Sequence, residues 1–301
     1  MEIKNIMVPT DFSQTSQTAL DYGVALARRL RARLTLLHVL EPQTIPDITT
    51  DIDIDKFDKG RRESALHELG ALLAPEDEDD LNLELVLKSG NPRKEIPLAV
   101  EEQHADLVVM GTQGRGRLGR LILGSTAEAL LRKLHVPVLT VSHVTSPRDI
   151  KRILFATDLS DSSRACFGFV LEAARTLHAD IVAMHAMGGP ALTSGELGFE
   201  VQPEELALQE AHRRLEGLMA EGRRHGVTVQ TCVADGPAAE QILKAAAETP
   251  ADLILLTIES KGFFERALLG TTAEHVVREA AVPVLSVPVH VETPESIPRI
   301  R

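Results

Sequence analysis

Short apolar runs alternate with longer stretches of helical periodicity along the chain. Residues 3–8 are an apolar run, and after Ser13 apolar positions recur at helical spacing up to Leu30. Later in the first half, strand patterns occupy residues 34–39, 83–87, 107–110 and 138–141, and helical patterns occupy 57–73, the segment after Asn91–Pro92, and 125–134. Strands that alternate with amphipathic helices predict a parallel sheet with helices on both faces.

The second half of the chain repeats this order. Residues 106–141 and 252–287 align without a gap at an offset of 146, and 15 of the 36 aligned positions are identical. Near the start, residues 6–13 (IMVPTDFS) match residues 153–160 (ILFATDLS). The period is a whole domain, because the unit of a solenoid has only about 20–50 residues. The repeat therefore indicates that one domain has been duplicated.

We expect two tandem domains of the α/β class, each a doubly wound, five-stranded parallel sheet. The expected limits are residues 1–144 for the first domain and 149–290 for the second, with a C-terminal tail over 291–301. The copies match poorly over residues 41–56 and 187–203. We interpret these two segments as variable excursions that follow the second strand of each copy.

Composition excludes several classes of protein. Hydrophobic residues make up 44% and charged residues 25% of the chain, which is typical of a globular protein, and no apolar run is long enough to span a bilayer. The first residues lack a basic stretch followed by an apolar one, so we expect no signal peptide, a cytoplasmic protein and two reduced thiols, Cys166 and Cys232. A net charge of −12, with no Trp and one Tyr, disfavours nucleic acid as a partner.

The segments that follow the strands are where a ligand site is expected, since open parallel sheets bind ligands beyond the carboxyl ends of their strands. After the fourth strand comes a glycine-rich segment, residues 111–119 (GTQGRGRLG). Its glycines expose backbone N–H groups, and Arg115, Arg117 and Arg120 suit phosphate oxygens. Helix N-termini bind anions, and a helix begins at 124–126 (GST). Together these features predict a polyphosphate site, with a flexible solvent loop as the alternative. Neither a Walker A motif nor a Rossmann GxGxxG is present.

The spacing Gly111-x2-Gly114-x9-Gly124-Ser125-Thr126 resembles the G-2x-G-9x-G-[S/T] signature of the ATP-binding universal stress proteins. The opening VPTDFS at 8–13 and the closing HVPVLTV at 135–141 are also similar to that family. The resemblance covers nearly the whole chain, once per repeat. It implies an adenine-nucleotide alpha hydrolase-like fold and a function in stress response and signalling, through ATP occupancy that alters conformation or the binding of a protein partner.

The resemblance also implies the roles of individual residues in the first copy. Residues on the adenine side would be Pro9, Thr10, Asp11 and Val39. Residues near ribose and phosphates would be Gly111, Gly114, Gly124, Ser125 and Thr126. Met110 and Arg115 complete the set of candidate nucleotide-binding residues. Mg²⁺ would accompany the nucleotide, although no protein ligand for it is evident. In single-domain relatives the last strand mediates dimerisation, so we expect residues 138–141 and 284–287 to face each other as an internal pseudo-dimer, with a homodimer of tandem chains as the alternative.

The second copy departs from the signature. Thr257 and Ser260 stand at the positions of the first two glycines, and Glu259 adds a negative charge where phosphates would lie. A like charge in a partly desolvated site costs on the order of 1 kcal/mol or more. Asp158 and residues 270–272 (GTT) keep part of the pattern. We expect weak or absent ATP binding there.

No catalytic motif is apparent, because the chain has neither a GxSxG elbow nor an HExxH. The segment 51–55 (DIDID) resembles the start of a calcium loop, but Lys56 occupies the position that requires glycine. His38 and His185 occupy equivalent strand positions, and we interpret both as structural. Two alternatives to an ATP-dependent regulator stay open: a slow ATPase or nucleotidyl-transfer enzyme, and a nucleotide-free interaction scaffold.

Overall fold

The computed structural model describes residues 3–42, 54–73, 81–114, 123–142, 147–188, 203–261 and 269–291. Its backbone contacts divide the chain into two compact units, residues 1–149 with 277–285 and residues 150–276 with 286–301. The predicted domain limits at 144 and 290, and the predicted pairing of the last strands, stay predictions. Most of the two excursions predicted after the second strands lies outside the described residues.

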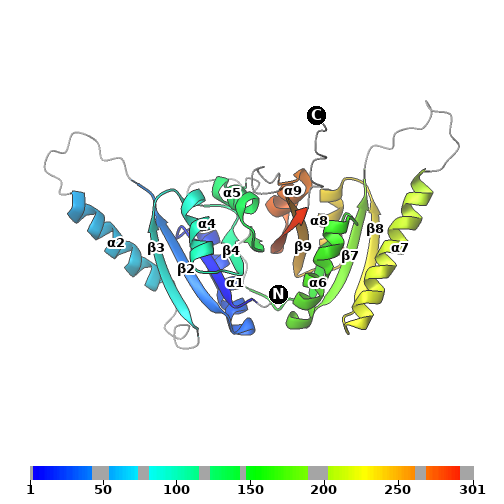
Figure 1. Ribbon diagram of the computed structural model, residues 1–301, viewed down its shortest axis with the longest axis horizontal. Helices are drawn as coiled ribbons and strands as arrows, with labels where there is room; N and C mark the ends of the chain where they lie inside the picture. Colours follow the sequence, from blue (N-terminus) through cyan, green and yellow to red (C-terminus); the bar gives the residue numbers. More distant parts are fainter. Residues whose placement is uncertain are drawn as a thin grey trace, which may run out of the picture. The chain divides into compact units, whose positions relative to one another are not determined.

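The first unit is a five-stranded parallel sheet with the strand order β3-β2-β1-β4-β5 (Figure 1). Its elements are β1 (Asn5–Thr10), α1 (Gln14–Leu30), β2 (Arg33–Leu40), α2 (Ile54–Gly70), β3 (Leu83–Ser89), α4 (Pro92–Glu102), β4 (Leu107–Gly111), α5 (Ser125–Lys133) and β5 (Val138–Val141). These elements follow the predicted order. The first strand begins and ends two residues later than expected and includes Pro9 and Thr10, and α2 lies three residues earlier than the predicted helix.

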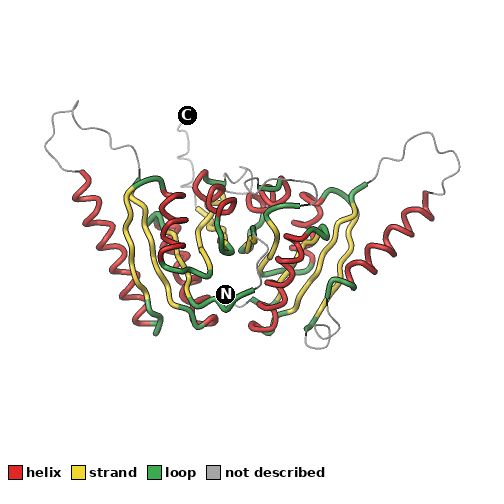
Figure 2. Tube along the Cα trace, turned by 180° about the vertical axis from the view of Figure 1, so that it is seen from behind, coloured by secondary structure: helices red, strands yellow, loops and turns green. Residues whose placement is uncertain are grey.

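The second copy repeats this architecture, with the strand order β10-β9-β6-β7-β8 and parallel pairs β6–β7, β6–β9 and β7–β8. The division by contacts counts residues 277–285 of this copy with the first unit. Its elements are β6 (Arg152–Ala156), α6 (Asp161–Leu177), β7 (Asp180–Met187), α7 (Pro203–Arg224), β8 (Val229–Asp235), α8 (Ala238–Glu248), β9 (Leu253–Lys261), α9 (Thr271–Glu279) and β10 (Val284–Val291). In each unit the helices flank the strands (Figure 2). The predicted fold class, two tandem doubly wound α/β domains, is confirmed.

The central strands carry the core because helices cover both of their faces. Ile6, Met7 and Val8 of β1 are fully buried, and so are the corresponding residues of β6. Strands buried on both faces are continuously apolar, as residues 6–8 and 153–155 are. Gly23 lets α1 lie close against β1, because a Cβ added there would be 2.5 Å from Val8 Cγ2.

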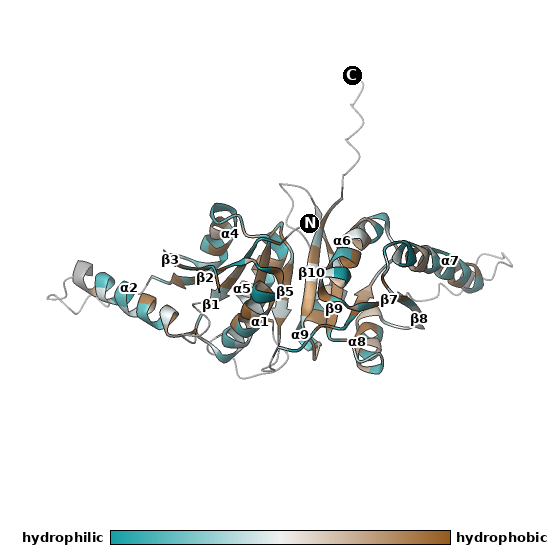
Figure 3. Ribbon diagram, turned by 90° about the horizontal axis from the view of Figure 1, so that it is seen from below, coloured by the Kyte–Doolittle hydropathy of each residue, from teal (hydrophilic) through white to brown (hydrophobic). Residues whose placement is uncertain are grey.

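The direction of each crossover places the helices on the two faces. Right-handed connections from β1 to β2 to β3 put α1 and α2 on one face, and the return through β4 to β5 puts α4 and α5 on the other. Figure 3 shows α4 opposite α1 and α2 in the first unit. The strand order reverses between β1 and β4, so a crevice is expected beyond the carboxyl ends of these two strands. No helix in the described parts of the chain is long and apolar enough to cross a membrane.

Candidate functional site

A pocket of about 640 Å³ opens beyond the carboxyl ends of β1, β2 and β4 in the first unit. Its volume lies within the range of about 300–1,000 Å³ that is typical of small-molecule sites. Ten of the eleven candidate residues line this pocket: Pro9, Thr10, Asp11, Val39, Met110, Gly111, Gly114, Gly124, Ser125 and Thr126. The eleventh, Arg115, lies outside the described residues, as do Arg117 and Arg120. The structure thus brings four separate segments of the sequence together around one cavity.

The turn between β1 and α1 holds Asp11 in place. Its Oδ1 accepts hydrogen bonds from the Ser13 N–H (3.1 Å) and the Ser13 hydroxyl (2.6 Å). Phe12 adopts a left-handed conformation (φ 60°), and its N–H donates to Thr10 Oγ1 at 3.0 Å. Ser13 also caps α1 by accepting a bond from the Ser16 N–H. Asp11 is therefore fixed through one oxygen, which orients its second oxygen.

The segment after β4 approaches this turn closely. A Cβ at Gly114 would lie 2.6 Å from Asp11 Oδ2, and a Cβ at Gly111 would lie 2.9 Å from the carbonyl carbon of Thr15 in α1. The Thr15 hydroxyl donates a hydrogen bond to the backbone oxygen of Gln113. Sequence reasoning attributed both glycines to the approach of a ligand. The structure adds that they are required by contacts within the protein.

The N-terminus of α5 opens into the pocket. Gly124 is its N-cap residue and provides no side-chain hydrogen bond to the first turn, while the Gly124 N–H donates to the Thr112 oxygen at 2.7 Å. Ser125 and Thr126 also line the cavity. A helix N-terminus without a side-chain acceptor carries partial positive charge and N–H donors, which suit an anionic ligand.

Several pocket residues were not predicted as site residues. Phe12 and His38 line the wall next to β2, and their ring centroids are 4.4 Å apart. On α2, Arg61, Ser64 and Glu68 also line the pocket. These residues are three to four positions apart, so they lie on one face of the helix. The sequence shows this spacing, but it does not show that the helix passes beside the pocket.

His38 has a structural contact, as interpreted from the sequence. Its Nδ1 is 2.8 Å from the Thr10 backbone oxygen, and His185 Nδ1 is 2.9 Å from the Thr157 oxygen in the second unit. Each histidine therefore ties the end of the second strand to the end of the first. Among the residues that the structure describes, no group of three or more His, Cys, Asp or Glu side chains could hold a metal ion.

The second unit repeats the turn but not the loop. Asp158 Oδ1 accepts from the Ser160 N–H (3.0 Å) and hydroxyl (2.6 Å), as Asp11 does from Ser13. In contrast, β9 continues to Lys261, four residues beyond Thr257, whereas β4 ends at the equivalent glycine. A Cβ at Gly270 would meet nothing within 4 Å, so this helix start lacks the close backbone approach found at its counterpart in the first unit.

Residues 2–142 and 149–288 each match the universal stress protein family. The chain belongs to this family. A universal stress protein of Methanocaldococcus jannaschii is 28% identical over 138 residues, which cover 46% of this chain and 81% of the relative. A putative universal stress protein of Staphylococcus aureus is 29% identical over 164 residues, 52% of this chain and 95% of the relative. Each relative thus corresponds in length to about one copy.

A solved structure extends the likeness to the whole tandem fold. The crystal structure of a universal stress protein from Archaeoglobus fulgidus has a TM-score of 0.69 at 22% identity, and the match covers 96% of this chain and 99% of that chain. At this identity the likeness concerns the fold alone. The family assignment that the sequence motifs suggested is confirmed.

Proposed function

We propose that the first copy binds ATP with Mg²⁺ and that its occupancy regulates a protein partner in a stress response. The observation that carries the proposal is the N-terminus of α5, which opens without a side-chain cap into the 640 Å³ pocket. Free N–H groups at a helix start suit phosphate oxygens. Because a helix start lines one part of the pocket and its volume exceeds that of a simple anion, the pocket suits a phosphorylated ligand.

The lining supports a nucleotide over a simple anion. The pocket is also lined by the apolar side chains of Val39, Met110 and Ile96, and by the Asp11 carboxylate. Apolar walls with a few fixed polar groups are typical of sites for aromatic ligands, and a carboxylate accepts hydrogen bonds such as those of an exocyclic amine. Mg²⁺ in such a site binds mainly to phosphates and water, which needs no dedicated set of protein ligands.

The second copy is proposed not to bind ATP. Thr257 replaces the glycine that approaches α1, and the extended strand β9 continues beyond it. In the first copy the strand ends at Gly111, and the Thr112 oxygen accepts a bond from the Gly124 N–H at the start of α5, whereas β9 continues as a strand past the equivalent position. The expected stoichiometry is one nucleotide per chain.

The test is to purify the full chain, denature it and identify the released nucleotide by chromatography. About one ATP per chain is expected, together with a rise in melting temperature on added ATP and Mg²⁺. About two per chain would contradict the assignment of the second copy. No nucleotide and no thermal shift would overturn ATP binding and leave the interaction scaffold. Phosphate release in the same preparation would distinguish a binder from a slow ATPase.

A further inference from the structure

Helices α2 and α7 occupy the same place in the two copies, so their residues can be compared one by one. The turn glycines after β3 and β8, Gly90 and Gly236, differ by 146 positions. The same offset superposes the buried positions of the two helices. Ala65 (5% exposed) corresponds to Ala211 (3%), and Leu69 (0%) corresponds to Leu215 (1%). The comparison therefore holds along the face that each helix buries.

By this register, Ser64 and Glu68 of α2 correspond to Glu210 and Arg214 of α7. Ser64 and Glu68 line the first pocket, and so does Phe12 in the β1–α1 turn across from them. The counterpart of Phe12 is Leu159, and both residues adopt the same left-handed conformation (φ 60°). Arg214 and Leu159 of the second copy therefore stand at the positions of Glu68 and Phe12, which line the pocket in the first copy.

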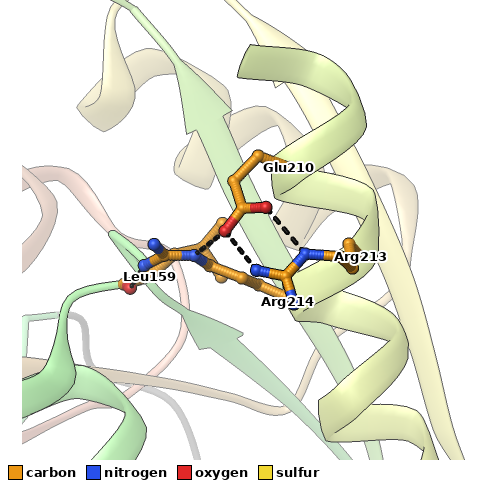
Figure 4. Close-up of polar contacts among 4 residues, drawn as sticks. All are labelled: Leu159, Glu210, Arg213 and Arg214. Carbon is orange, nitrogen blue, oxygen red and sulfur yellow. Dashed lines mark hydrogen bonds and ion pairs between the residues drawn. The ribbon is translucent and has the colours of Figure 1, made fainter. Parts of the chain in front are cut away.

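In the second copy a side chain joins α7 to the β6–α6 turn (Figure 4). Arg214 Nη1 donates to the backbone oxygen of Leu159 at 2.8 Å, and Arg214 Nε donates to Glu210 Oε1 at 2.7 Å. Glu210 also accepts two hydrogen bonds from Arg213, at 2.7 and 2.6 Å. The two arginines lower the pKa of Glu210 to about 2. Arg214 is thus held on its own helix and reaches across to the β6–α6 turn.

We propose that Arg214 is a strap that closes the nucleobase side of the cleft in the second copy. The strap is separate from the altered glycine loop, because it joins α7 to the β6–α6 turn and touches neither β9 nor α9 in these contacts. The Arg214 side chain joins α7 to the β6–α6 turn at positions whose counterparts, Glu68 and Phe12, line the first pocket. With its altered glycine positions and the Arg214 contact, the second copy therefore differs from the first at both ends of the region where a nucleotide would lie.

The strap can be tested without any ligand by hydrogen exchange on the full chain. Arg213→Ala is the matched control for Arg214→Ala, because both arginines bond to Glu210 and only Arg214 bonds to Leu159. We expect the amides of Leu159 and Ser160 to exchange about two- to five-fold faster in Arg214→Ala, the range for loss of one exposed ionic contact. The control should leave them unchanged. Equal exchange in the two variants would overturn the strap.

A second test transfers the strap to the first copy, and this arm rests on the proposed ATP site. The double variant Ser64→Glu with Glu68→Arg places a Glu–Arg pair on α2 at the spacing of Glu210 and Arg214. Its control is Ser64→Glu with Glu68→Gln. Both positions are exposed, so the core is not disturbed.

Whether ATP binding becomes tighter or weaker distinguishes the two effects of the new arginine. A positive charge beside the pocket should tighten binding of an anionic nucleotide by Coulomb attraction, whereas a strap to the Phe12 oxygen should weaken it. We expect ATP affinity by calorimetry to be about two- to five-fold weaker than in the Gln control. Equal or tighter binding would contradict closure by the arginine. If the unmodified chain binds no ATP, the proposed function fails, and the exchange experiment alone decides the strap.

Discussion

The contact between Gly114 and Asp11 allows binding and folding to be separated by single substitutions. In Gly114→Ala the new Cβ would lie 2.6 Å from Asp11 Oδ2, closer than the 3.0 Å that side chains essentially always keep. The carboxylate is the end of a short side chain and can rotate. The carboxylate can pivot about its Oδ1, which keeps the bonds to Ser13 and turns Oδ2 away from the pocket.

The expected loss is that of one hydrogen bond between a charged group and the ligand, about 1.5–3 kcal/mol. At 1.36 kcal/mol for each factor of ten, ATP affinity should fall about 10- to 150-fold. Stability should change little, because no backbone atom has to move. Gly111→Ala is the contrasting variant, since its Cβ would lie 2.9 Å from the carbonyl carbon of Thr15 in a packed helix. Overpacking of this kind costs about 1–3 kcal/mol, a fall of roughly 2–12 °C in melting temperature.

The assay is calorimetric titration with ATP and Mg²⁺ together with thermal unfolding of each variant. Gly270→Ala is the control, because a Cβ there would meet nothing within 4 Å and the position belongs to the second copy. It should match the unmodified chain in both measurements. Unchanged affinity in Gly114→Ala, with its fold intact, would refute the role given to Asp11. Reduced affinity without reduced stability in Gly111→Ala would show that this glycine approaches the ligand rather than α1.

Three further outcomes follow from individual contacts. Burial raises the pKa of Cys166 to about 12, so in the folded chain at pH 8 a thiol reagent should modify the partly exposed Cys232 and reach Cys166 only on unfolding. Hydrogen bonds from its two arginines lower the pKa of Glu210 from 4.5 to about 2, so the slow exchange at Leu159 should persist at pH 4 and be lost as the pH falls towards 2. Gly23→Ala should lower the free energy of unfolding by about 1–3 kcal/mol in denaturant titration, because its Cβ would lie 2.5 Å from Val8 Cγ2.

Local signals in the sequence predicted much of this architecture. Ser13 caps α1, and Asn91 caps α4 by accepting a bond from the Arg93 N–H at 2.9 Å with Pro92 in the first turn, as the sequence indicated. The predicted strands formed in the expected order. Such features depend on neighbouring residues alone, so a single sequence contains them. The convergence of the candidate residues on one pocket followed from a general property of parallel sheets.

Contacts between distant residues could not be read in this way. Glu68 reaches the pocket only because α2 passes beside the ends of the strands, and the chain between β2 and α2 gives no periodic signal for that path. Arg214 and Leu159 are 55 positions apart, and nothing local marks their bond. The extension of β9 was also not expected, because β4 ends at Gly111, which is aligned with Thr257. In each case the deciding interaction depends on how whole elements pack.

The comparison of the two copies explains why part of the site pattern persists where we propose no nucleotide. Thr157 and Ser163 bond through their hydroxyls at 2.8 Å, and Asp158 accepts two bonds from Ser160, so these residues build the left-handed turn that starts α6. They are needed for that turn whether or not a ligand is present. An Asp after the first strand is therefore weak evidence for nucleotide binding. The discriminating features are the glycine that approaches α1 and the side chain that α2 or α7 presents to the cleft, and in the second copy both have changed.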